Sequence, residues 1–295
     1  AEQSPKRDLS SHLIFSKLDS CWPTRLPDGL HWKSGVSSFP VGNRGQVMIN
    51  SSVALVVGAS RGIGLAITRQ LLQEQGIQRI YASYRNADTA TGLLEINDDR
   101  LQTTRADITN SAELQGLAAT IKANADHPDF VINAAGILHE DSLQPEKALS
   151  QCQPDTLTRM FQVNSIGPLM LARAIIPLMP KDRPGHFAVL SAMVGSITDN
   201  RLGGWYGYRA SKAALNQFMR TLSVECRRSH PQLCITAIHP GTTDTSLSRP
   251  FQANVKPGKL YTTTESAARI LKVVSASQAE QSGQFMNWDG KPIPW

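Results

Sequence analysis

Tyr208 and Lys212 stand four positions apart in the run Tyr-Arg-Ala-Ser-Lys, a spacing that puts a phenol and an ammonium on one face of a helix. An isolated phenol keeps its proton up to about pH 10, and a fixed neighbouring cation stabilises the phenolate. We therefore expect Lys212 to lower the pKa of Tyr208, so that Tyr208 exchanges a proton with a substrate near neutral pH. Taken alone, the pair also fits a surface aromatic residue beside a solvated lysine.

A glycine-rich run lies upstream of this pair. Residues 53–57 are apolar and mostly β-branched, glycines follow at 58, 62 and 64, and helical spacing continues to about residue 75. Strand, glycine turn and helix in this order form the dinucleotide-binding fingerprint, in which the turn and the helix N-terminus receive a pyrophosphate. A glycine-rich turn without a ligand is the alternative.

The end of the next predicted strand, residues 79–84, indicates which dinucleotide fits. A carboxylate there would bind the ribose 2′-hydroxyl of NAD(H), but the chain has Arg85, and Arg61 in the glycine turn is a second cation. Guanidinium groups suit a phosphate monoester, so the sequence favours NADP(H). Ser60 and Ser83 are further candidate donors.

Strands and helices alternate from about residue 50 onward. This alternation predicts an α/β fold, a single doubly wound parallel-sheet Rossmann domain with its ligand crevice at the carboxyl ends of the strands. The predicted strands are 53–57, 79–84, 101–105, 129–133, 185–190, 233–238 and 283–287, and the predicted helices are 62–75, 111–124, 155–178, 208–228 and 264–275.

Several motifs occur in an order that resembles the short-chain dehydrogenase/reductase family over about residues 50–295. Residues 191–216 and 289–295 resemble the C-factor and sniffer branch of carbonyl reductases. The resemblance implies transfer of hydride between NADP(H) and a carbonyl or alcohol substrate. The motifs that carry it are Gly58 to Gly64, Asn133-Ala-Ala-Gly136, Asn164, Ser191 and Tyr208 to Lys212.

The resemblance also implies roles for individual residues. Tyr208 would exchange the proton with the substrate oxygen, and Lys212 would lower its pKa and bind the nicotinamide ribose. Ser191 would hold the carbonyl oxygen, and Asn164 would hold a water that links Lys212 to solvent. The implied cofactor-binding residues are Gly58, Ser60, Arg61, Gly62, Ile63, Gly64, Arg85, Asp107, Ile108, Asn133, Ala134, Ala135, Gly136, Tyr208, Lys212, Pro240, Gly241, Thr243 and Thr245.

One departure from the family pattern concerns the catalytic residues. Ser191 lies farther from Tyr208 than in most members, and we interpret the intervening Gly-Gly-Trp segment as an enlarged loop at the edge of the pocket. Tyr206 is a rival acid by position, but the residue four places on is Ala210, which is no cation.

The composition indicates a protein without a membrane span, because no apolar run approaches the roughly 18 residues that a bilayer requires. The net charge of +6 is spread along the chain, so we do not expect nucleic-acid binding. No metal site is expected either, because the four cysteines have no paired spacing, and a reducing compartment follows. These cysteines are Cys21, Cys152, Cys226 and Cys234.

Residues 1–46 have no sustained period and are interpreted as an N-terminal extension to the domain at 47–295. They are a flexible segment, a targeting remnant or a segment that packs on the domain. We expect a cytoplasmic protein, or a plastid or mitochondrial one if the extension is a targeting remnant. By resemblance, helices 155–178 and 208–228 would pair with another subunit in a homodimer or homotetramer.

The substrate is the least determined part of this interpretation. Apolar residues near the expected pocket suggest an apolar carbonyl compound, and residues 246–259 are interpreted as a lid. A regulatory protein that binds the dinucleotide with incidental turnover is the alternative function. The residues expected to border the pocket are Leu138, His139, Met193, Val194, Trp205 and 246–259.

Overall fold

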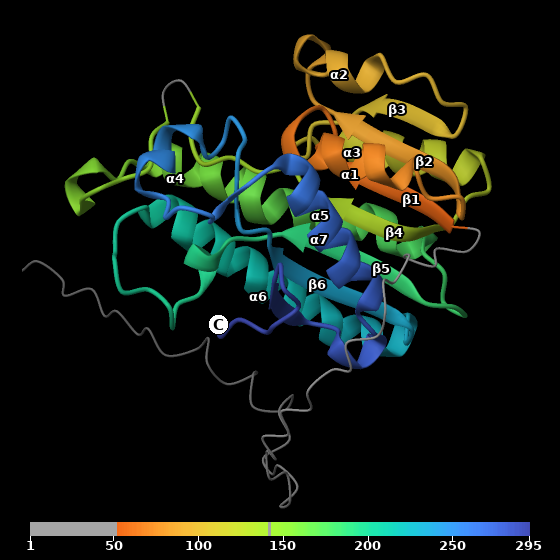
Figure 1. The fold of residues 1–295 in the computed structure, drawn as a ribbon. Helices are drawn as coiled ribbons and strands as arrows, with labels where there is room; N and C mark the ends of the chain where they lie inside the picture. Colours follow the sequence, from red (N-terminus) through yellow and green to blue (C-terminus); the bar gives the residue numbers. More distant parts are fainter. Residues whose placement is uncertain (1–51, 141–142) are drawn as a thin grey trace, which may run out of the picture. The chain divides into compact units, whose positions relative to one another are not determined.

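The computed structural model describes residues 52–140 and 143–295 (Figure 1). The expectations about residues 1–46, about the domain boundary that follows them and about Cys21 lie outside these residues. Cys152, Cys226 and Cys234 are free thiols. Among the described residues, no helix combines the length and the apolar character needed to cross a bilayer.

Seven parallel strands form one sheet in the order β3-β2-β1-β4-β5-β6-β9. The strand order reverses direction between β1 and β4, and such a switch point opens a crevice at the carboxyl ends of the strands. The predicted doubly wound α/β fold is therefore confirmed. The strands are β1 (Ser52–Val57), β2 (Ile77–Tyr84), β3 (Leu101–Arg105), β4 (Pro128–Asn133), β5 (Gly185–Leu190), β6 (Leu233–His239) and β9 (Gln284–Asn287).

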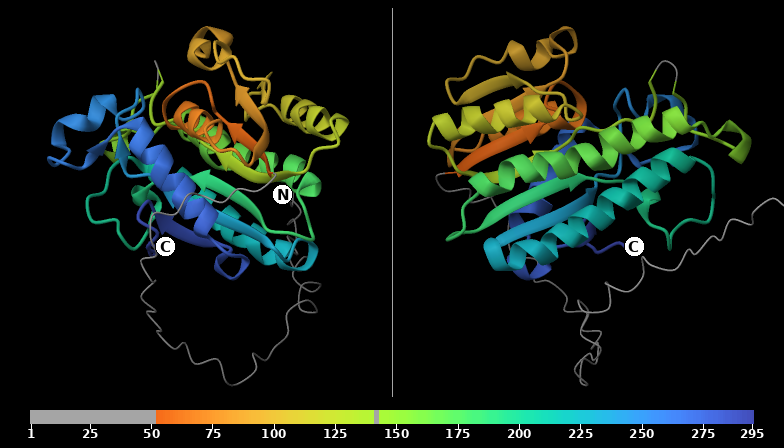
Figure 2. Two further views of the ribbon diagram at one scale, coloured as in Figure 1. Left: turned by 45° about the vertical axis from the view of Figure 1, so that its right-hand side comes forward. Right: turned by 180° about the vertical axis from the view of Figure 1, so that it is seen from behind.

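Helices cover both faces of this sheet (Figures 1 and 2). Ile67 and Leu271 of α1 and α7 pack on one face, and Leu117, Leu171 and Met219 of α3, α5 and α6 pack on the other. Such two-sided burial explains why β1 and β4 read as continuous apolar runs. The helices are α1 (Gly62–Leu71), α2 (Thr91–Leu94), α3 (Ser111–Ala123), α4 (Pro154–Phe161), α5 (Gly167–Ile175), α6 (Tyr206–Ser229) and α7 (Thr263–Ala276).

Two helices differ from their predicted extent. α1 ends at Leu71 instead of residue 75, and the Arg100 guanidinium then binds the carbonyl oxygens of Leu72 and Glu74 at 2.6 and 3.3 Å. The predicted helix 155–178 is interrupted by a π-helical turn over Gln162–Ile166. Such turns insert one extra residue and often occur at functional sites.

Short elements near the strand ends were not predicted. A 3-10 turn covers Ala87–Thr89 after β2. The two-residue strands β7 (Thr242–Thr243) and β8 (Leu260–Tyr261) pair beyond β6, and a further 3-10 helix covers Arg249–Asn254. β7, β8 and the second 3-10 helix bound the segment that follows β6, so they place residues 240–261 beside the sheet's carboxyl edge.

Candidate active site

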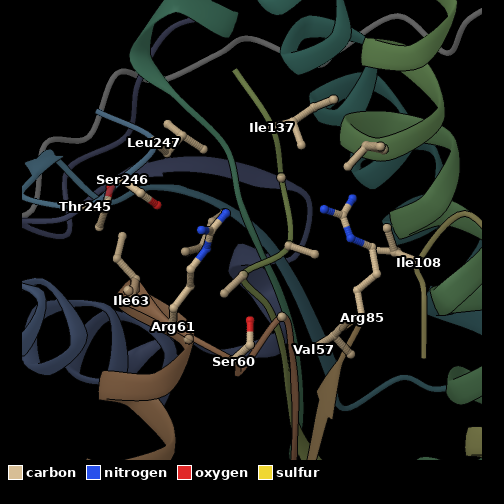
Figure 3. A pocket seen from close by; sticks show the side chains of 18 of the residues that line it. Val57, Ser60, Arg61, Ile63, Arg85, Ile108, Ile137, Thr245, Ser246 and Leu247 are labelled. Carbon is tan, nitrogen blue, oxygen red and sulfur yellow. The ribbon is translucent and has the colours of Figure 1, made fainter. Parts of the chain in front are cut away.

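One cavity of about 240 Å³ lies at the carboxyl edge of the sheet, where the turns after β1, β2, β3, β4, β5 and β6 meet (Figure 3). It brings together segments that are up to about 190 positions apart in the sequence. Seventeen of the predicted site residues line it: Gly58, Ser60, Arg61, Gly62, Ile63, Gly64, Arg85, Asp107, Ile108, Ala134, Ala135, Gly136, Ser191, Tyr208, Lys212, Pro240 and Thr245.

The glycine turn after β1 is shaped by close backbone approach. Gly58 has a φ of +78°, and a Cβ atom there would lie 2.7 Å from the backbone nitrogen of Ala135 in the turn after β4. A side chain at Gly64 would collide with the carbonyl oxygen of Gly58. Only glycine fits both positions. The turn therefore presents bare backbone and the N-terminus of α1 to the cavity, an arrangement that suits a pyrophosphate.

Two arginines stand on opposite sides of the cavity, with Ser60 between them (Figure 3). Arg61 forms no ion pair with any described residue. Arg85 pairs with Glu140 at 3.2 Å, and Arg159 of α4 binds the same carboxylate at 3.1 and 3.3 Å. The bonds from Arg159 and the charges of both arginines hold the pKa of Glu140 below its usual range. Arg85 therefore borders the cavity while its guanidinium already has an acidic partner.

Asp107 and Ile108 follow β3 and line the same side of the cavity as Arg85. Burial acts to raise the pKa of Asp107, but two hydrogen bonds from Thr109 and the positive charges of Arg85 and Arg159 outweigh it and lower this pKa. Asp107 is therefore an anion at neutral pH, and the two hydrogen bonds from Thr109 hold its carboxylate in place.

Tyr208 and Lys212 lie in the first turns of α6, and both side chains are buried, at 7% and 4% exposure. Lys212 Nζ donates a 2.8 Å hydrogen bond to the carbonyl oxygen of Leu190 and lies 5.9 Å from the centre of the Tyr208 ring. Burial raises the pKa of Tyr208 above its usual value and lowers the pKa of Lys212 to about 8. The predicted proximity is thus confirmed.

The expected lowering of the Tyr208 pKa is wrong for the chain as the structure describes it. Burial disfavours the charged form of either group, and the Lys212 ammonium donates to the last carbonyl of β5. Tyr208 is therefore protonated at neutral pH, the state in which a phenol donates a proton.

Ser191 begins the segment after β5, and its hydroxyl donates a 2.7 Å hydrogen bond to Oδ1 of Asn216. Asn216 lies four residues after Lys212 on the same face of α6, and its Nδ2 binds the carbonyl oxygen of Gly195 at 3.4 Å. The Ser191 side chain is thereby held at the cavity wall by the helix that carries Tyr208. Sequence reasoning missed Asn216, although its i+4 spacing from Lys212 was an available signal.

Asn164 is fully buried in the π-helical turn and does not line the cavity. Its Oδ1 accepts the backbone N–H of Ile137 at 2.8 Å, and its Nδ2 donates to the Ile137 carbonyl and to Ser211 Oγ at 2.9 and 3.1 Å. Asn164 therefore ties the turn after β4 to α6. The role of holding a water beside Lys212 stays a prediction.

Four other candidates also lie behind the cavity wall. Asn133 Oδ1 accepts the backbone N–H of Ala135 at 3.1 Å, and Thr243 Oγ1 bonds to Ser266 Oγ at 2.6 Å. Gly241 packs against the ring of Tyr261. Ser83, a candidate extra donor, is fully buried and does not reach the cavity. These residues support the turns that line the cavity.

The cavity also has lining residues that the sequence did not single out as site residues. Most are apolar residues that flank a predicted motif, and their position beside it was the only available signal. They are Val57, Thr89, Ala106, Ile137, Val163 and Leu190.

Of the residues expected at the substrate end, Ser246 and Leu247 line the cavity, whereas His139, Trp205 and Phe251 pack together. The rings of Trp205 and Phe251 lie 5.0 Å apart, and Phe251 also contacts the ring of His139 at 5.9 Å. His139 Nε2 donates a 3.1 Å hydrogen bond to the carbonyl oxygen of Ser246. An aromatic cluster therefore joins the turn after β4, the segment before α6 and residues 246–251.

The family model for short chain dehydrogenases matches residues 52–256. The chain belongs to the short-chain dehydrogenase family. It is therefore an oxidoreductase of this family, and the resemblance read from the motifs is confirmed. The motif-bearing segments from the glycine turn to Pro240 all fall within the matched residues.

Two curated relatives show how far the similarity extends. A 1-hydroxy-2-glutathionyl-2-methyl-3-butene dehydrogenase from Rhodococcus sp. (strain AD45) is 30% identical over 247 residues, which cover 83% of this chain and all of the relative. The C-signal protein of Myxococcus xanthus is 31% identical over 149 residues, which cover 50% of this chain and 84% of that protein.

Solved structures with the same fold include two carbonyl reductases. The NADPH-bound carbonyl reductase from chicken fatty liver has a TM-score of 0.73 and 26% identity, with 84% of this chain and 95% of the other covered. Carbonyl reductase Sniffer of D. melanogaster has a TM-score of 0.72 and 27% identity, with 83% of this chain and all of the other covered.

Proposed function

We propose that the protein reduces an aldehyde or ketone with NADPH and that Tyr208 donates the proton. The observation that carries this proposal is that the buried Tyr208–Lys212 pair lines the same cavity as the glycine turn after β1. A proton donor and a dinucleotide-binding turn on one cavity are what carbonyl reduction requires. The NADPH-bound carbonyl reductase of similar fold supports the choice of cofactor.

The residues around the cavity fit a dinucleotide phosphate. Bare backbone at Gly58 and Gly64 makes room for a pyrophosphate, and Arg61 and Arg85 supply positive charge for a 2′-phosphate. Pro240 and Thr245 also line the cavity and would border the nicotinamide. When bound, the cofactor supplies the hydride.

The chain's own residues orient the substrate and move the proton. Ser191 donates its proton to Asn216 Oδ1 in the described chain, and on substrate binding its hydroxyl would turn to donate that proton to the carbonyl oxygen instead. Tyr208, whose pKa is raised by burial, would give its proton to that oxygen as charge develops there. Lys212, charged below about pH 8, would stabilise the phenolate that this step leaves behind.

Cofactor preference is a direct prediction of this geometry. Replacing Arg61 or Arg85 with alanine should raise the Kd for NADPH about 10- to 100-fold, because each charge-assisted bond to a phosphate is worth about 1.5–3 kcal/mol. The Kd for NADH should change little. Fluorescence titration of both nucleotides measures this. Arg79→Ala is the control, because Arg79 pairs with Asp126 near the start of β2, whereas Arg85 follows the end of that strand. An equal loss of affinity for NADH would contradict the assignment.

The function itself is tested by following NADPH absorbance with a panel of apolar aldehydes and ketones. We expect consumption of NADPH with at least one aromatic or aliphatic carbonyl compound, and formation of the corresponding alcohol. The similarity to the C-signal protein motivates one alternative, a regulatory protein in which the dinucleotide is a ligand. Tight NADPH binding with no consumption across the panel would favour that alternative.

A further inference from the structure

Glu146 is a buried acid that the proposed reaction does not use. Its exposure is 3%, and no cation among the described residues lies within ion-pair distance. A buried carboxylate is costly unless other groups compensate its charge. Its Oε2 accepts the backbone N–H of Gly207 at 3.1 Å, and its own carbonyl oxygen accepts the backbone N–H of Trp205. Glu146 therefore binds the chain on both sides of the first residue of α6.

The N-terminus of α6 accounts for this buried charge. The first amides of a helix have no partner within it, and the positive end of the helix dipole stabilises an anion. The residue before α6, Trp205, does not cap the helix with its side chain. The Glu146 carboxylate caps it instead. A Cβ atom at Gly207 would lie 2.9 Å from Glu146 Oε1 and 3.0 Å from Leu157. Glycine at this position lets the acid reach the helix.

The turn that Glu146 binds has an unusual backbone. Gly203, Gly204 and Trp205 have φ values of +64°, +63° and +52°, and a left-handed conformation is unfavourable for a bulky residue such as tryptophan. The Arg209 side chain holds the turn from the other side, since its Nε donates to the carbonyl oxygens of Gly203 and Gly204 at 3.2 and 3.0 Å. Such a conformation persists only where neighbouring bonds enforce it.

The consequence of this turn lies at the proton donor. Tyr208 follows Gly207 directly, and the Trp205 ring packs edge-on against the Tyr208 ring with centres 6.1 Å apart. The Trp205 ring also contacts the Phe251 ring, with centres 5.0 Å apart. The bonds of Glu146 therefore determine where the Trp205 ring and the start of the catalytic helix stand relative to each other.

We propose that Glu146 is a positioning residue: it anchors the left-handed turn before α6 and so holds Tyr208 and Trp205 in the arrangement that the reaction needs. The catalytic part of this inference rests on the proposed carbonyl reduction. The structural part does not, because it concerns only the amides of Trp205 and Gly207.

The experiment compares Glu146→Ala and Glu146→Gln with the wild type. In Glu146→Ala, hydrogen–deuterium exchange in peptides covering residues 203–210 should become faster, and kcat should fall about 10- to 100-fold, because misplacement by about 1 Å can cost this much. The Kd for NADPH should stay within about twofold of the wild-type value, since Glu146 does not line the cavity. Glu146→Gln keeps an oxygen acceptor and should recover most of the lost kcat.

Asp129 provides a matched control. It is equally buried, at 4% exposure, and accepts bonds from the Val53 N–H and the Arg183 guanidinium at the opposite end of the sheet. Asp129→Ala should destabilise the protein without changing kcat of the folded enzyme or exchange at residues 203–210. If Glu146→Ala does not fold, Gly207→Ala serves instead, because its methyl group pushes the carboxylate away, and the same loss of kcat is expected.

Three results would overturn the proposal: unchanged exchange at residues 203–210 in Glu146→Ala, unchanged kcat in a folded Glu146→Ala, or a Glu146→Gln variant as impaired as Glu146→Ala. If the wild-type protein turns over no carbonyl compound, the proposed function fails, and the exchange measurement still decides whether Glu146 anchors the turn.

Discussion

Replacing Tyr208 with phenylalanine is expected to lower kcat for carbonyl reduction by about 10²- to 10⁴-fold, the range that a positioned general acid contributes. The variant removes the donor hydroxyl but keeps the ring that packs against Trp205. The Kd for NADPH should therefore stay within about twofold. Steady-state kinetics with the best carbonyl substrate, together with a fluorescence titration of NADPH, measure both quantities.

The neighbouring tyrosine provides the control for this experiment. Tyr206 is 43% exposed and does not line the cavity, so Tyr206→Phe should leave kcat within about twofold of wild type, as is usual for surface substitutions away from a site. A Tyr208→Phe protein that binds NADPH and reduces carbonyl compounds at the wild-type rate would exclude Tyr208 as the proton donor.

Replacing Lys212 with methionine should lower kcat by about 10²-fold or more, because the charge that stabilises the Tyr208 phenolate is then missing from a buried site. In the wild type this charge is lost as the pH rises through about 8, the pKa to which burial lowers Lys212. In the wild type, kcat should therefore fall above about pH 8. In Lys212→Met, kcat should be low at every pH and should show no such fall. A pH–rate profile of both proteins measures this.

Whereas kcat should fall as the pH rises through the pKa of Lys212, the free energy of unfolding should rise. The pKa of Lys212 is about 8 in the folded protein and 10.5 as a free side chain, so between these values the unfolded chain binds more protons and the free energy of unfolding rises with pH. The difference corresponds to about 3 kcal/mol. Relative to Lys212→Met, the wild type should therefore gain stability from pH 8 to 10.5, as followed by urea unfolding. A difference that stays constant over this range would show that Lys212 is not buried as a cation.

The sheet was predictable because its physical cause is local. Strands buried on both faces are apolar along their whole length, as β1 and β4 are, and the alternation with helices indicated the more polar strands such as β3. All seven predicted strands lie within two residues of their observed ends. The residues that line the cavity follow these strands directly, so most of them were also predictable. The close pairing of Tyr208 and Lys212 follows from helical spacing alone.

The features that were missed depend on contacts between distant segments. The ion pair of Arg85 with Glu140 joins residues 55 positions apart, and no local pattern marks it. The π-helical turn at Gln162–Ile166 lies where the Asn164 amide binds Ile137 and Ser211, which are likewise remote in sequence. The raised pKa of Tyr208 was missed for the same reason, because spacing reveals the neighbouring charge but not the depth of burial.

The order of the strands has a consequence for folding. β1 is made first, yet its cavity-lining turn is completed by segments that follow β4, β5 and β6, up to Leu247. Contacts of such long sequence separation form late and slowly. A nascent chain shorter than about 250 residues would therefore lack a complete nucleotide site. A ligand of this cavity should stabilise the full-length folded protein by mass action but should not stabilise earlier folding intermediates.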